Sequence, residues 1–144
     1  MSLRFDRLMD EKDALQMNAL QLAYLGDSVW ELIVRYDLAV RRYNVHHMHK
    51  DCVGMVNAHA QYRILGSIQE LLTETEAEIV RRGRNAHAKH PAPRNQNPDE
   101  YAASTGFEAL FGFLYLTGQN ERITELVKHI REENDHGRTE KTEG

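Results

Sequence analysis

Along most of this chain, apolar residues recur at steps of three and four positions, and this helical period constrains the fold more than any other feature of the sequence. The longest such series, in residues 13–40, consists of Leu15, Leu22, Leu25, Val29, Ile33 and Leu38. No segment alternates apolar and polar residues for long, and no Asn-Gly or Asp-Gly pair marks a hairpin. The sequence therefore predicts an all-α fold.

Local signals set the ends of the predicted helices. Thr73 and Glu76 have the spacing of a capping box. Asn97 is a natural N-cap, because Pro98 follows it and Glu100 can close a second capping box. The expected helices cover about residues 13–40, 49–72, 74–85, 98–117 and 121–133, with loops at 41–49 and 86–98. These elements form a single domain over residues 1–133, and the polar residues 134–144 are expected to be a disordered tail.

Length and composition agree with one ordered domain. The chain has 144 residues, of which 41% are apolar and 28% are charged. Its single cysteine, Cys52, cannot form an internal disulfide, and the first residues lack the apolar core of a signal peptide. No apolar run approaches the about 20 residues that a membrane helix needs. We therefore expect a cytoplasmic protein with no membrane segment.

Positive charge is concentrated in one stretch, although the net charge of the chain is -4. Residues 79–98 contain no Asp or Glu. Their basic side chains are Arg81, Arg82, Arg84, Lys89 and Arg94, accompanied by His87 and His90. This pattern indicates either a solvated basic surface or a surface that binds phosphate groups.

Two carboxylates interrupt apolar helical stretches. Asp27 lies in "LAYLGDSVWE" and Glu108 in "STGFEALFGFLYL", and neither has a Lys or Arg three or four residues away. Each could face solvent or pair with a distant arginine. Alternatively, the two could meet and hold a cation, since a buried carboxylate must be neutralised, paired or metal-bound. A site made only of oxygen ligands favours Mg²⁺ or Mn²⁺, which promote phosphodiester hydrolysis.

These two stretches resemble a known family. "YLGDSV" is similar to the "FLGDSV" core of the ribonuclease III signature, and "FEALFGFLYL" is similar to that family's second acidic motif. The resemblance runs from about Leu20 to Leu116. "RRGRNAHAKHP", together with "YAASTGFEALFGFLYLTGQNERI", resembles Mini-ribonuclease III, the short form of the family without a double-stranded RNA-binding domain.

The resemblance implies an all-helical homodimer that cleaves double-stranded RNA with Mg²⁺, for which Mn²⁺ can substitute, and leaves 5′-phosphate products. It also implies maturation of the 5′ and 3′ ends of the 23S ribosomal RNA precursor. Asp27 matches the catalytic, metal-binding Asp of the family and Glu108 its metal-binding Glu. The residues that would then contact the RNA backbone are Arg81, Arg82, Arg84, Asn85, His87 and Lys89.

The sequence departs from the family pattern at three positions. Standard ribonuclease III has carboxylates where this chain has Ala23, Leu20 and Thr105. The resemblance thus implies a thinner set of metal ligands, to which Glu31 could contribute through water. A rival interpretation is a non-catalytic double-stranded RNA-binding or ribosome-assembly module on the same fold. A further rival is a helical adaptor that binds no RNA, against which the basic stretch argues.

Other residues have less specific interpretations. The group His46, His47 and His49 lacks a convincing fourth zinc ligand. Tyr24 and Trp30 are expected in the core. The aromatic stretch at 107–116 suits either core packing or a dimer interface.

Overall fold

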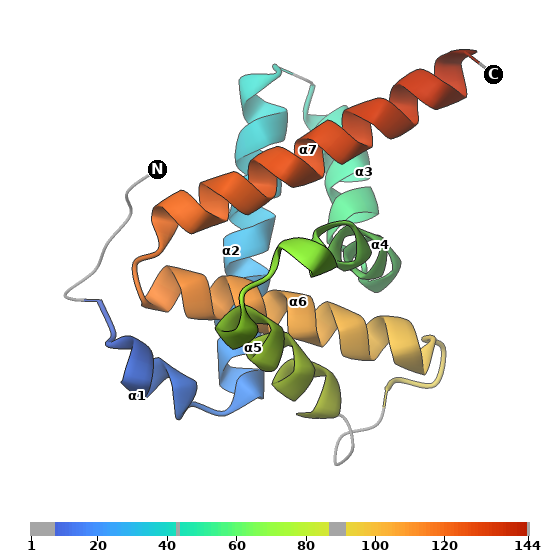
Figure 1. The fold of residues 1–144 in the computed structure, drawn as a ribbon. Coiled ribbons are helices and arrows are strands. Elements are labelled where there is room, and N and C mark those ends of the chain that lie inside the picture. Colours follow the sequence, from blue (N-terminus) through green and yellow to red (C-terminus); the bar gives the residue numbers. More distant parts are fainter. Residues whose placement is uncertain (1–7, 43, 87–91, 144) are drawn as a thin grey trace.

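Helix α6 (Pro98–Leu116) runs through the middle of the molecule (Figure 1). In the computed structural model, which describes residues 8–42, 44–86 and 92–143, three helices pack directly on it: α2 (Ala19–Val40), α4 (Ala58–Ile68) and α5 (Glu74–Asn85). The remaining elements are α1 (Glu11–Leu15), α3 (Val45–Val56), the 3₁₀ helix Gln69–Leu71 and α7 (Asn120–Glu143). No strand occurs in these ranges, so the all-α prediction is confirmed. No helix there is long and apolar enough to cross a membrane.

The core forms around the aromatic residues of α6. Phe107, Phe111 and Phe113 are almost fully buried. Trp30 of α2 stands edge-on to Phe107, with ring centroids 5.0 Å apart, and its indole Nε1 donates a hydrogen bond to the Met55 carbonyl at 3.0 Å. These side chains therefore pack within a single chain, and the expected core position of Trp30 is confirmed.

Asparagine caps divide two of the predicted helices. The helix predicted at 13–40 consists of α1 and α2, because the Asn18 side chain accepts a hydrogen bond from the backbone of Leu20 and Gln21 completes a capping box. The helix predicted at 49–72 divides at Asn57, which caps α4. The loop predicted at 41–49 is also wrong in part, since α3 begins at Val45. At Asn18 and Asn57 a local side-chain acceptor competes with continuation of the helix.

The better-marked helices were predicted closely. Helix α5 has both hydrogen bonds of the Thr73–Glu76 capping box. Helix α6 begins after Asn97, whose side chain accepts hydrogen bonds from two backbone N–H groups, and Gly118 follows its end with φ of 72°. Helix α7 extends to Glu143 rather than ending near residue 133, and the division of the chain at 133 stays a prediction.

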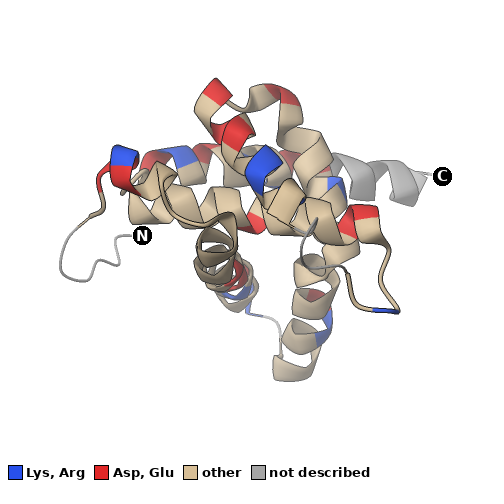
Figure 2. Cartoon of the chain, turned by 90° about the horizontal axis from the view of Figure 1, so that it is seen from below, with Lys and Arg blue, Asp and Glu red and all other residues tan. Residues whose placement is uncertain are grey.

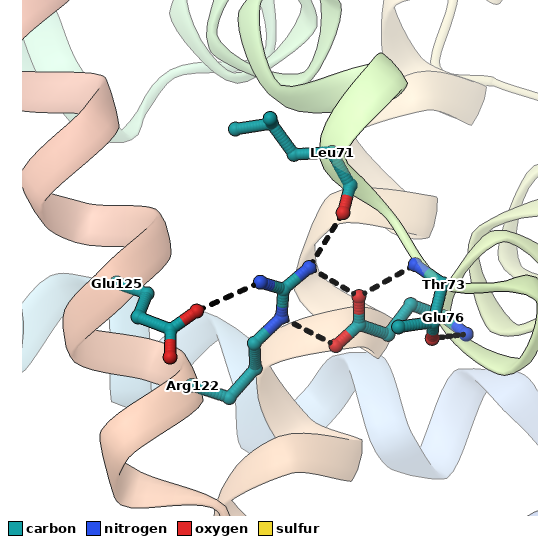
Figure 3. A network of polar contacts seen from close by, with 5 residues as sticks. All are labelled: Leu71, Thr73, Glu76, Arg122 and Glu125. Carbon is teal, nitrogen blue, oxygen red and sulfur yellow. Dashed lines mark hydrogen bonds and ion pairs between the residues drawn. The ribbon is translucent and has the colours of Figure 1, made fainter.

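A buried ion pair holds α5 against α7 (Figure 3). Arg122 donates two hydrogen bonds to the Glu76 carboxylate, at 2.8 and 2.9 Å, and another to the Leu71 carbonyl at 2.6 Å. Burial alone would raise the pKa of Glu76, but hydrogen bonds from Arg122 and Thr73 outweigh burial and hold that pKa below its usual range. The network fixes the start of α5, the helix that carries the basic stretch.

Candidate active site

Helices α2 and α6 cross in direct backbone contact. A Cβ atom on Gly26 would collide with the carbonyl oxygen of Glu108, and one on Gly112 would collide with the carbonyl oxygen of Leu22. Only glycine permits this approach. Because Asp27 directly follows Gly26, the crossing brings Asp27 beside Glu108.

The two carboxyl groups predicted from the sequence do meet. Asp27 is exposed, whereas Glu108 is only partly accessible. Burial raises the pKa of Glu108 to about 9, and a hydrogen bond with Asp27 and the negative charge of Asp27 add to the rise. Glu108 therefore keeps its proton at neutral pH and shares a hydrogen bond with Asp27.

The alternative of a distant arginine partner fails for this pair. Within the described ranges, neither Asp27 nor Glu108 forms an ion pair with a Lys or Arg. Glu31, the possible water-mediated helper, instead pairs with Arg35 at 2.9 Å. A carboxyl pair without a neutralising cation is chemically suited to a divalent ion, which can replace the proton held by Glu108.

The surroundings of the pair add few ligands. Ala23 and Thr105 are buried beside the crossing, and the Thr105 hydroxyl donates to the Tyr101 carbonyl at 3.1 Å. No group of three or more His, Cys, Asp or Glu residues with metal-binding geometry occurs in the described part of the chain. Two carboxylates with solvent access fit an Mg²⁺ ion that takes its other ligands from water and substrate phosphate.

Helix α5 reaches α6 through a second pair of glycines. A Cβ atom on Gly83 would lie 2.6 Å from the Cα atom of Gly106, two residues before Glu108. The C-terminal part of α5 and the N-terminal part of α2 emerge on the same side of α6, the lower side in Figure 1, which Figure 2 shows from below. The described C-terminal end of α5 and the N-terminal part of α2 thus border one face of the molecule.

The basic residues of this stretch have different surroundings. Arg81 forms an ion pair with Glu78, and Arg82 donates to the carbonyl oxygens of Leu15 and Met17 at 2.6 and 2.7 Å. Arg82 therefore ties α5 to the connection between α1 and α2. Arg84 and Asn85 are exposed. His87 and Lys89 lie outside the described residues.

Tyr24 was misplaced by the sequence prediction. It is 85% exposed, one turn before Asp27. It belongs with Leu32 and Tyr36 to an exposed apolar side of α2, next to a groove of about 550 Å³ between α2 and α7. Such a side has the same three-to-four spacing as a core-facing side, and sequence alone does not distinguish them. His46, His47 and His49 are exposed on α3 rather than in a loop.

Comparisons with known proteins agree with this arrangement. Residues 20–119 match the family model described as Ribonuclease III domain. A Mini-ribonuclease 3 of Symbiobacterium thermophilum is 50% identical over 115 residues, which are 79% of this chain and 88% of the relative. A Mini-ribonuclease 3 of Synechococcus sp. is 43% identical over 128 residues, covering 89% and 91% of the two chains. A crystal structure of a Fusobacterium nucleatum protein superimposes with a TM-score of 0.74 at 30% identity, covering 83% of this chain and 95% of that one.

Proposed function

The chain belongs to the ribonuclease III family and is an endoribonuclease that acts on double-stranded RNA, and we propose that Asp27 and Glu108 hold the Mg²⁺ ion on which its cleavage depends. The observation that carries this proposal is the carboxyl pair itself, which has one partly buried member and no pairing cation in the described residues. Loss of the Glu108 proton leaves two negative charges that favour a divalent ion over a monovalent one.

Mg²⁺ bound there would lower the pKa of a water ligand and offset negative charge on the scissile phosphate. The oxygen of the water forms a bond to phosphorus as the bond from phosphorus to the 3′ oxygen breaks. The water gives up its proton to solvent, and the 3′ oxygen takes up one. The products therefore carry a 5′-phosphate and a 3′-hydroxyl. Asp27 and Glu108 orient the reaction by fixing where the phosphate can sit.

The proposed substrate is duplex RNA, in particular the paired ends of the 23S ribosomal RNA precursor. Proteins read duplex RNA chiefly through phosphates, 2′-hydroxyls and shape. We assign the backbone contacts to Arg81, Arg84 and Asn85 on the described part of α5, and to His87 and Lys89 beyond it. Arg82 also contributes by holding α5 in place, since two of its N–H groups donate to main-chain carbonyls. This substrate places the reaction in the cytoplasm.

We also propose that the enzyme is a homodimer. The groove between α2 and α7 is lined mainly by apolar side chains, and Tyr24, Leu32 and Tyr36 extend the apolar surface along α2 toward Asp27. A second copy covering this surface through a twofold axis would place two carboxyl pairs on one duplex, one for each strand. The aromatic residues of α6 are less suited to this role, because they are buried in the protomer core.

Leu32→Lys tests the dimer. The variant should sediment as a monomer, because a charge would enter the apolar contact. Val53→Lys, at a side chain that is 65% exposed on α3, is the matched control and should keep the mass of the wild type. Equal masses for both variants at micromolar concentration would contradict this interface.

The activity test compares substrates. Wild-type protein should cut labelled 23S-end duplex RNA with Mg²⁺ and not with chelator, while leaving single-stranded RNA and duplex DNA uncut. Asp27→Asn should bind the duplex without cutting it. Tight duplex binding without cleavage by the wild type would instead favour the non-catalytic RNA-binding or ribosome-assembly module.

A further inference from the structure

Tyr101 shares a face of α6 with Glu108. The seven residues from one to the other make nearly two turns, so their side chains leave the helix about 20° apart in direction and about 10 Å apart along its axis. From Ala103 to Leu114, every residue of α6 is buried except Glu108, whereas Tyr101 is again partly accessible. On the N-terminal side of Glu108, Tyr101 is thus the next accessible residue of this face.

Only small side chains lie between Tyr101 and Glu108 on this face. Ser104 and Thr105 occupy the intervening turn, and both hydroxyls donate back to the Tyr101 carbonyl, at 2.9 and 3.1 Å. Helix α2 covers α6 on the other side of Glu108, where a Cβ atom on Gly112 would collide with the α2 main chain. A ligand that extends from the carboxyl pair along α6 therefore runs toward Tyr101.

Tyr101 also follows directly on the end of the basic stretch. Residues 92–97 lead into α6 with the Arg94 side chain exposed, and the Tyr101 N–H donates to the Asn97 carbonyl at 3.0 Å. Along α6, Tyr101 thus lies between the carboxyl pair and the basic stretch, to which the contacts with the RNA backbone are assigned.

We propose that the Tyr101 hydroxyl forms a hydrogen bond with a 2′-hydroxyl of the RNA, a few nucleotides from the scissile phosphate, and contributes in this way to the choice of RNA over DNA. This inference rests on the proposed function and names a chemical group that the site reads. An axial separation of about 10 Å corresponds to a few nucleotides along one strand.

The chemistry of duplex RNA favours the hydroxyl over the ring as the contact. The bases of a duplex are paired and stacked, so the Tyr101 ring has no free base on which to stack. A phenol is uncharged, and it both donates and accepts hydrogen bonds, as a 2′-hydroxyl does. The charged phosphates are matched by the arginines of α5 instead.

A purely structural role for the Tyr101 hydroxyl makes a different prediction. If the hydroxyl served only the fold, its removal would lower stability or slow cleavage by the same factor for every substrate. A contact with one 2′-hydroxyl instead couples Tyr101 to a single nucleotide position of the RNA. Tyr101→Phe keeps the ring and removes only the hydroxyl, so this coupling can be measured.

The test measures cleavage by the full chain with Mg²⁺ at subsaturating RNA. The substrates are 23S-end duplexes with one 2′-deoxy nucleotide, moved one position at a time along each strand. For the wild type, a deoxy nucleotide at one position near the scissile phosphate should slow cleavage about 3- to 10-fold, the size of one neutral hydrogen bond. Tyr101→Phe should slow cleavage of the all-ribose duplex by a similar factor and lose the deoxy penalty at that position alone.

Tyr62→Phe is the matched control, since it removes a hydroxyl from a side chain that is 45% exposed on α4. It should keep the rate and the pattern of deoxy penalties of the wild type. Wild-type rates for Tyr101→Phe, or a uniform loss of rate that leaves every deoxy penalty unchanged, would overturn the proposal for Tyr101. Absence of duplex cleavage by the wild type would overturn the proposed function instead.

Discussion

Glu108→Gln separates the stability of the fold from the function of the site. The pKa of Glu108 rises from its ordinary value of 4.5 to about 9 in the folded protein, chiefly through burial. Between these pH values the unfolded chain loses a proton that the folded protein keeps, so the free energy of unfolding falls as pH rises. At pH 7, about 2.5 pH units above the unfolded pKa, this cost reaches up to about 3 kcal/mol at about 1.4 kcal/mol per unit. It vanishes below pH 4, where both states are protonated.

Glutamine has the shape of protonated Glu and can donate the same hydrogen bond to Asp27. The variant should therefore be more stable than the wild type at pH 7–8 in chelator, and equally stable at pH 4, while losing cleavage. The assay is urea unfolding at several pH values. Adding Mg²⁺ should stabilise the wild type by binding its folded state and leave the variant unchanged. Equal or lower stability of Glu108→Gln at pH 8 in chelator would show that Glu108 is ionised in the folded protein and refute the reasoning.

Two other changes test the packing that positions the site. Arg122→Met leaves the buried Glu76 carboxylate unpaired and should cost about 2–3 kcal/mol in urea unfolding at pH 7, below the value for a fully buried pair because the Arg122 side chain is 23% exposed. Because the pKa of Glu76 is held below its usual value, the ion pair stabilises the fold above about pH 4.5, and its contribution fades as pH falls. The unfolding free energies of the wild type and Arg122→Met should therefore converge in acid. Parallel plots of unfolding free energy against pH would contradict this explanation. Gly26→Ala should force α2 away from α6, lower the free energy of unfolding by at least about 3 kcal/mol and abolish cleavage. The control is Gly66→Ala, whose Cβ would meet no atom within 4 Å. It should raise the free energy of unfolding by about 0.5–1 kcal/mol and cleave normally. A Gly26→Ala protein with normal melting and cleavage would show that the helices need not touch.

Local chemistry determined how well each helix could be predicted. The ends of α5 and α6 are set by caps within a few residues, which a sequence displays directly. Asn18 and Asn57 also act through local caps, but each lies inside an otherwise continuous helical period, where an asparagine can equally face solvent. The breaks were therefore missed, although the signal was present.

The site depends on contacts distant in sequence, and these were harder to predict. Periodicity gave no information on whether Asp27 and Glu108 meet; the two glycines at the crossing, Gly26 and Gly112, are the sequence features that allow it. The carbonyl partners of Arg82 lie 65 and 67 residues away, so its structural contribution is invisible in the basic stretch.

Metal binding in the absence of RNA tests whether Asp27 and Glu108 form the metal site. Electron paramagnetic resonance can count free Mn²⁺ as it is titrated into RNA-free wild-type protein, Asp27→Asn and Glu108→Gln at pH 8. We expect one saturable class of site in the wild type, weakened at least about 10-fold in both variants, since each loses one of two charged ligands. Unchanged Mn²⁺ binding in Asp27→Asn and Glu108→Gln would place the metal at another site and rule out a metal-binding role for the carboxyl pair.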